Sequence, residues 1–158
     1  MAFALALAAT LAGAGKASAA YNDFLIQTNS CFSTTPGVAL NYSQWGPYNS
    51  SNATAINVNC PVAMPNHNYT SVYLQMTGWS RNQADKLSCT VHSTGYDGYS
   101  HFGATATVPY NTAAAQTAIA SINPNLGGTP YVYVTCHIPA ANPAGTSYLG
   151  TVYLSASW

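Results

Sequence analysis

Charge is the feature that this 158-residue sequence has least of. Three Lys or Arg residues face three Asp and no Glu, so the formal net charge is zero and charged residues make up 4% of the chain. Soluble domains average about 25%. A protein that follows nucleic-acid phosphates needs clustered Lys and Arg, so the composition excludes that class of partner. Charge-driven disorder is also excluded, because 48% of the residues are hydrophobic and can form a core.

Catalytic motifs are scarce as well. The sequence has no Gly-x-Ser-x-Gly nucleophile elbow and no glycine-rich phosphate loop. A glycosidase needs two facing carboxylates, and the candidates are Asp85 and Asp97. Asp97 belongs to an Asp-Gly turn and Asp85 to a polar, loop-like stretch, so two solvated carboxylates are the simpler interpretation. We therefore predict a protein that is not an enzyme and has no cofactor, and a hydrolase remains a minor alternative.

The cysteines occur without any Cys-x-x-C pair, which argues against a zinc ribbon or a thioredoxin-type redox site. Cys31, Cys60, Cys89 and Cys136 form an even, widely spaced set. In an oxidising compartment such a set indicates two disulfides. Four cysteines allow three pairings, of which we favour Cys31–Cys60 with Cys89–Cys136.

The N-terminal segment differs from the rest of the chain. It is apolar from residue 2 to residue 14, too short to span a bilayer, and ends in Ala17-Ser18-Ala19, a small-x-small pattern that signal peptidase accepts. Lys16 follows the apolar run, whereas signal peptides carry their positive charge before it. We predict a helical signal peptide at residues 1–19 and a single exported domain at 20–158, secreted or periplasmic and free of the membrane. The alternative is an N-terminal helix that stays attached.

The exported part alternates apolar and polar residues with a period of two. The alternation is clear at residues 55–62, 71–76, 131–138 and 151–158, with Pro, Gly and Asn between these stretches. Half-buried strands have this pattern. It predicts an all-β antiparallel sandwich, either jelly-roll or immunoglobulin-like. Residues 112–122, led by Asn111 as a potential cap, fit a helix and a strand equally well.

One hairpin can be built in detail around the two-residue turn Asp97-Gly98. The turn places Thr94 opposite His101 and His92 opposite Gly103. One face of the hairpin is then apolar, with Cys89, Val91, Phe102, Ala104, Ala106 and Val108. Cys89 points into the core here and Cys136 does so on its own strand, as a buried disulfide requires.

The same hairpin places His92 and His101 diagonally on its outer face, about 7–8 Å apart between backbones. Imidazole binds zinc, copper and nickel, so these two residues with Asp97 or His137 are a candidate metal site. The sequence places no third ligand, and exposed strand residues are the simpler interpretation.

A series of motifs resembles those of an uncharacterised family of secreted bacterial four-cysteine proteins. The motifs are Cys31, Trp45-Gly46-Pro47-Tyr48-Asn49-Ser50-Ser51, Cys60-Pro61-Val62, Ser88-Cys89-Thr90, and the Tyr-rich stretches 131–139, which ends Cys-x-Ile-Pro, and 147–154. The resemblance implies an exported β-sandwich with two disulfides and implies no activity. The immunoglobulin fold is less similar, because Gly46-Pro47 directly after Trp45 is typical of a loop.

Four tyrosines lie on the polar side of their strands and are the candidate contact residues: Tyr73, Tyr131, Tyr133 and Tyr153. Tyrosine combines an apolar ring with a hydroxyl group and suits contact surfaces. We predict surface association or adhesion, including self-association, through a neutral face rich in Tyr, Asn and Thr. The alternative is a module that binds glycans or another ligand, with Trp45 and Trp79, in loop-like sequence, available to stack on sugars. Ordinary strand composition also explains outward tyrosines.

Overall fold

The computed structural model describes residues 21–64, 69–94, 101–123 and 131–157. The expected signal peptide and the Asp97-Gly98 turn lie outside these residues. The described chain is built from strands and one short 3-10 turn, η1 (Thr28–Ser30), and none of it is α-helical. The strands are β1 (Tyr21–Ile26), β2 (Phe32–Ser33), β3 (Asn41–Ser43), β4 (Gly46–Tyr48), β5 (Ile56–Cys60), β6 (Ser71–Trp79), β7 (Ser88–Thr94), β8 (His101–Thr107), β9 (Gln116–Ile122), β10 (Tyr131–Ile138) and β11 (Tyr148–Ser157). Within the described ranges, no helix has the length and apolar character needed to cross a membrane.

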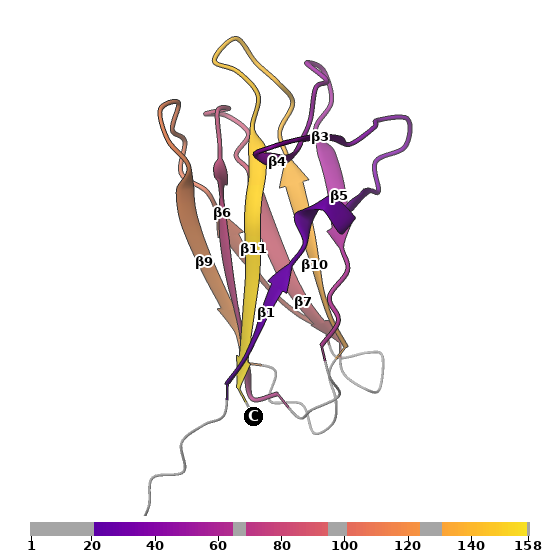
Figure 1. Ribbon diagram of the computed structural model, residues 1–158, viewed down its shortest axis with the longest axis vertical. Helices are drawn as coiled ribbons and strands as arrows, with labels where there is room; N and C mark the ends of the chain where they lie inside the picture. The colour runs from indigo at the N-terminus through magenta and orange to yellow at the C-terminus, as the bar shows by residue number, and fades with distance from the viewer. Residues whose placement is uncertain (1–20, 65–68, 95–100, 124–130, 158) are drawn as a thin grey trace, which may run out of the picture.

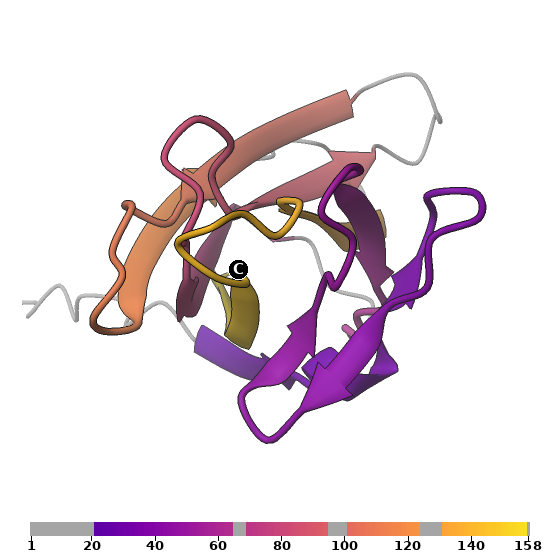
Figure 2. The same ribbon diagram turned by 90° about the horizontal axis from the view of Figure 1, so that it is seen from above.

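The strands form two antiparallel sheets packed face to face, so the predicted all-β sandwich is confirmed (Figure 1). Sheet A has the order β3-β4-β11-β6-β9, and β1 also pairs with β11. Sheet B has the order β2-β5-β10-β7-β8. Viewed from above, the strands curve around a common interior (Figure 2).

Consecutive strands change sheet at almost every connection. Among the described strands, only the consecutive pairs β3–β4 and β7–β8 lie in one sheet. Neighbours within a sheet therefore come from distant parts of the sequence. β11, for example, pairs with β1, β4 and β6. This connectivity decides which outward side chains meet.

Both expected disulfides are present, Cys31–Cys60 and Cys89–Cys136. Cys136 lies directly opposite Cys89 where β10 pairs with β7. Cys31 and Cys60 adjoin the pair Phe32 and Asn59, which joins β2 to β5. The Cys89–Cys136 disulfide thus links two neighbouring strands of sheet B, and the Cys31–Cys60 disulfide links β5 to the residue that precedes β2. Antibody-type immunoglobulin domains instead carry a disulfide between their two sheets.

The period-two pattern is confirmed by burial, since the apolar residues of the strands face the space between the sheets. The largest fully buried side chains are Ile56, Leu74, Met76, Leu87, Ile138, Leu149, Leu154, Val58, Val72, Val91, Val108 and Val134. The hairpin register is confirmed as well, with Thr94 opposite His101 and His92 opposite Gly103. Phe102 keeps the expected side of β8, opposite the buried Ser93, but it lies one position from the start of the strand and is 39% exposed.

Residues 112–122 resolve into a bend followed by a strand. The Asn111 side chain accepts hydrogen bonds from the backbone N–H groups of Ala113 and Ala114, as a helix cap would. No helix follows, because β9 pairs along β6 and turns Ala118 and Ile122 toward the core. Tertiary pairing therefore outweighs the helix propensity of the alanines.

Candidate functional site

The four predicted contact tyrosines do not share one surface. Tyr131 and Tyr133 lie on β10 in sheet B, whereas Tyr73 and Tyr153 lie on β6 and β11 in sheet A. All four point away from the core, because their neighbours along each strand are buried. The two pairs consequently occupy opposite outer faces of the sandwich.

The outer face of sheet B carries a histidine–tyrosine cluster formed by His92, His101, Tyr131 and Tyr133. The His92 ring stacks on Tyr133 with centroids 4.6 Å apart and planes 10° apart. Its Nδ1 is hydrogen-bonded to His101 Nε2 at 3.2 Å and its Nε2 to Thr135 Oγ1 at 2.8 Å. Burial, and secondly the proximity of His101, lower the pKa of His92. Hydrogen bonds connect the two histidines, and ring contacts join the two tyrosines to them.

The described residues provide no third ligand for the candidate metal site at His92 and His101. His137 bonds Asp85 at 2.8 Å and Asn57 at 3.0 Å, so both of its ring nitrogens are engaged. No group of three His, Cys, Asp or Glu side chains comes together in the part of the chain that the structure describes. Asp97 lies outside it.

The carboxylates that the structure describes do not face one another. Asp85 pairs with His137 of sheet B, and Asp23 belongs to β1 of sheet A. Hydrogen bonds from Tyr153 and then Ser155 lower the pKa of Asp23. Each carboxylate therefore has its own local partner, and no glycosidase-type pair forms between these two.

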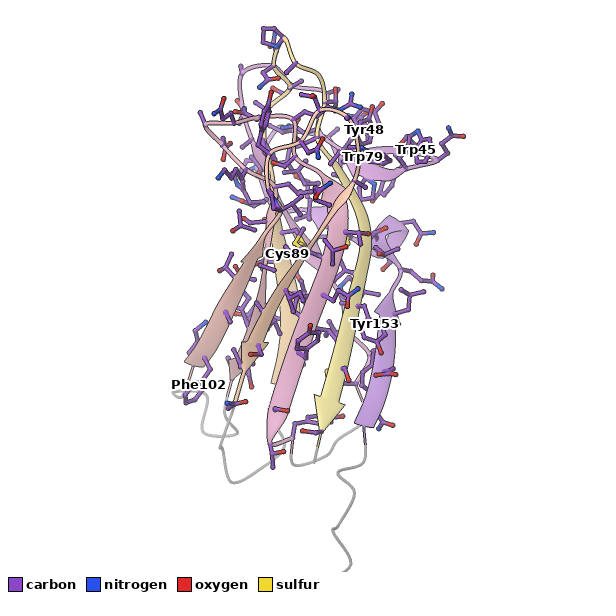
Figure 3. The ribbon with its side chains drawn as sticks, turned by 90° about the vertical axis from the view of Figure 1, so that its left-hand side faces the viewer. Trp45, Tyr48, Trp79, Cys89, Phe102 and Tyr153 are labelled. Carbon is purple, nitrogen blue, oxygen red and sulfur yellow. A yellow bond between two sulfur atoms is a disulfide. The ribbon has the colours of Figure 1, made fainter. Side chains whose placement is uncertain are left out.

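The most distinctive arrangement lies at one end of sheet A, where three aromatic residues form a row across three strands. Tyr148 of β11 pairs with Tyr48 of β4 on one side and with Trp79 of β6 on the other. The Tyr48 and Tyr148 ring centroids are 5.3 Å apart, and those of Trp79 and Tyr148 are 6.2 Å apart. Trp45 meets Trp79 edge to face at 5.1 Å. Figure 3 shows Trp45, Trp79 and Tyr48 together at this end, away from Tyr153.

Trp45 is presented by a two-residue turn, Gln44-Trp45, between β3 and β4. The Ser43 hydroxyl group accepts the Trp45 backbone N–H at 3.1 Å and donates to the Gly46 carbonyl at 3.1 Å. Gly46 has φ +109°, and a Cβ there would overlap the Leu149 carbonyl oxygen. Only glycine allows both the positive φ and the close approach to Leu149, so the turn is held tightly against β11.

The far end of β4 is anchored by Asn49, which is fully buried. Its amide nitrogen donates to the carbonyl oxygens of Thr54, Ile138 and Pro139, and its Oδ1 accepts the Ser51 N–H. These bonds tie the hairpin to the end of β10. Trp45 is thus presented from an element fixed on both sides.

Two hollows flank the tryptophans, and Trp45 and Trp79 line both. One, of about 390 Å³, has both polar and small residues in the rest of its lining: Thr28, Ser43, Gln44, Gly46, Thr77, Gly78, Ala115, Gly150 and Thr151. The other, of about 310 Å³, is completed by Arg81 and Tyr148. Ligand pockets in proteins begin at about 300 Å³. The Trp45 side chain, 53% exposed, is accessible between them. We call these residues the tryptophan site.

Sequence reasoning found part of this site. Trp45 lies in a turn, as expected, whereas Trp79, expected in a loop, is the last residue of β6. Tyr48, Tyr148 and Arg81 were missed. What brings these residues together is the pairing of β4, β11 and β6. The sequence does not reveal this pairing, and its many tyrosines do not show which of them meet.

A further hollow, of about 400 Å³, adjoins the histidine–tyrosine cluster. It is lined by Phe32, Asn59, Pro61, Val62, Tyr131, Val132 and Tyr133. Tyr131 is 73% exposed. This hollow has no tryptophan and no charged residue, and it is the second candidate for contact with a ligand.

Comparison with known proteins gives a fold likeness. No protein-family model matches the chain, and no curated protein does. A solved structure described as a xylan-binding module, CBM15, superposes with a TM-score of 0.57 at 14% identity, covering 87% of this chain and 97% of that one. The C-terminal CBM6 of LamC, a marine laminarinase from Zobellia galactanivorans, gives 0.49 at 14% identity, with 84% and 98% covered.

Proposed function

We propose that this protein is a non-catalytic glycan-binding module whose site is the tryptophan site. The carrying observation is the exposed Trp45 ring, which stands with Trp79 between two hollows. The likeness of the fold to a module described as xylan-binding supports a binding role. The two disulfides support a site of action outside the cytoplasm, since disulfides persist in oxidising compartments.

The chemistry of the larger hollow fits a neutral sugar. Tryptophan rings offer flat apolar surface to the C–H face of a pyranose. The hydroxyl and amide groups of Ser43, Gln44 and Thr151 lie at the same hollow and can bond sugar hydroxyls. The Thr77 and Thr151 hydroxyl oxygens are 2.6 Å apart, so these donors are already held in place. A prepositioned polar wall lowers the entropy lost on binding.

The test is glycan binding by the purified, oxidised protein and its Trp45→Ala variant. Calorimetry with xylo-oligosaccharides, after a polysaccharide screen, measures the affinity. We expect Trp45→Ala to weaken binding by about 10-fold or more, as central tryptophans do at binding sites. The variant should fold normally, because the ring is half exposed.

Tyr131→Ala is the matched control, since it removes a still more exposed ring from the opposite sheet. If Tyr131→Ala abolishes binding and Trp45→Ala preserves it, the glycan site lies on sheet B instead. A wild-type protein that binds no glycan in the screen would overturn the proposed function.

Self-association is the second candidate function, and one observation on sheet A favours it. Leu25, Tyr153, Gln75 and Ile119 lie in one register row across β1, β11, β6 and β9. Leu25 and Ile119 are 68% and 54% exposed. An outward row with two exposed aliphatic residues suits contact with a second copy of the chain.

A further inference from the structure

The smaller hollow of the tryptophan site combines aromatic rings with a cation. Its lining is Trp45, Trp79, Tyr148 and Arg81. The described residues contain two cationic side chains, Arg81 and Lys86, apart from the histidines. A chain with very little charge therefore places one of these two cations beside three aromatic rings.

Arg81 is positioned by the loops at this end of the sandwich. Its backbone N–H donates to the Ser147 hydroxyl oxygen at 3.0 Å. Gly145, with φ +119°, passes so close that a Cβ there would lie 3.0 Å from Arg81 Nη1 and 3.1 Å from its Cδ. The side chain is partly buried. Its location is therefore set by packing on two segments.

Two residues of this hollow carry buried donors that the protein leaves unpaired. Among the described residues, Trp79 Nε1, Arg81 Nε and Ser93 Oγ are the buried side-chain polar atoms without a hydrogen-bond partner. Arg81 also forms no ion pair with a carboxylate among the described residues, where Asp85 pairs with His137. Unpaired buried donors are uncommon and costly. Two of the three belong to residues that line this hollow, where the Arg81 charge has no partner carboxylate.

We propose that this hollow binds a glycan residue that carries a carboxylate, namely a uronic acid. The pyranose ring packs against the aromatic side chains, and the carboxylate oxygens accept hydrogen bonds from the Arg81 guanidinium group. Arginine is suited to this because its planar fork matches a carboxylate in two parallel bonds. The proposal rests on the proposed function, since it specifies which glycans the tryptophan site prefers.

The test compares two xylo-oligosaccharides of equal length, one neutral and one carrying a single glucuronic acid branch. We expect the wild-type protein to bind the acidic one more tightly by about 10-fold or more, as hydrogen bonds to a charged group allow. The preference should shrink as salt is added, because salt screens the charge pair. Arg81→Gln should bind both oligosaccharides equally, and Arg81→Lys should keep a reduced preference.

Lys86→Gln is the control, since it removes the same charge from an exposed side chain that lines neither hollow. Thermal unfolding verifies that each variant folds. If Arg81→Gln does not fold, Arg81→Lys provides the test in its place. Equal wild-type affinity for both oligosaccharides overturns the uronate proposal and leaves the proposed function standing. Loss of the preference in Lys86→Gln, or its survival in Arg81→Gln, overturns the assignment to Arg81. Failure to bind either oligosaccharide overturns the uronate proposal, and the proposed function falls with it only if the polysaccharide screen is negative as well.

Discussion

His92 is the residue whose surroundings most directly couple protonation to folding. Burial disfavours its charged form, and the His101 ring beside it adds to this effect, so its pKa in the folded protein lies below the ordinary value. In the unfolded chain the pKa of histidine is about 6.5. Between the two values the unfolded state binds more protons, so the free energy of unfolding rises with pH. The stabilisation is complete above about pH 6.5 and is lost as the pH falls through the folded-state pKa.

We therefore expect urea unfolding to give a higher midpoint at pH 7.5 than at pH 5. His101→Gln should reduce this difference without abolishing it, because burial, the larger cause of the lowered pKa, remains. Urea unfolding midpoints measure the pH dependence of stability, and proton NMR titration measures the pKa of His92. A urea midpoint that is lower at pH 7.5 than at pH 5 would contradict the sign of the coupling.

At the scale of elements, the β3–β4 hairpin has the most demanding geometry. Three residues on each side leave little pairing to hold it, so its position depends on close contact with β11 and on the Asn49 anchor. Gly46 allows that contact. Gly78 of β6 is similar, since a Cβ there would lie 2.6 Å from the Tyr148 carbonyl oxygen. Small residues thus let three strands meet beneath the aromatic rings.

Substituting alanine for Gly46 should destabilise the protein by about 3 kcal/mol or more, because left-handed strain and overlap with the Leu149 carbonyl combine. Gly37→Ala is the matched control: Gly37 also has positive φ, +74°, but nothing lies within 4 Å of the added Cβ. It should lower the free energy of unfolding by about 1 kcal/mol. Denaturant unfolding compares the two variants. Equal losses would show that the contact with β11 does not constrain the hairpin.

On the scale of the whole molecule, the sandwich has two unlike outer faces and almost no charge to keep copies apart. Sheet B holds both disulfides and the histidine–tyrosine cluster, whereas sheet A presents the exposed aliphatic row. A formal net charge of zero provides little repulsion between molecules. These properties favour association through sheet A.

We expect the mass measured by light scattering to rise with protein concentration. Ile119→Lys should suppress this rise, because it places a charge in the exposed row of sheet A. Tyr131→Lys, an equivalent change on sheet B, should leave it unaffected. A constant monomer mass at high concentration would rule out self-association.

Local patterns in the sequence were sufficient for much of this architecture. Period-two alternation places residues such as Val134 and Cys136 on the inner side of their strand whichever strand pairs with it, because the geometry of a strand is local. The Asp97-Gly98 motif likewise predicted the register of β7 and β8 that the structure has, since a two-residue loop leaves one choice of partners. The pairing of Cys89 with Cys136 followed from both residues pointing inward.

The candidate site depended on tertiary structure. Tyr48, Tyr148 and Trp79 meet because β11 enters sheet A between β4 and β6, and that order is set by connections that repeatedly cross between the sheets. For the same reason, the sequence did not determine which outward tyrosines share a face. Alternation of apolar and polar residues indicates that a side chain points outward, but it does not indicate to which sheet the strand belongs. By itself the sequence determined inside and outside along each strand, because that depends on neighbouring residues. Only the tertiary structure decided which strands lie side by side, because that depends on packing between residues far apart in the chain.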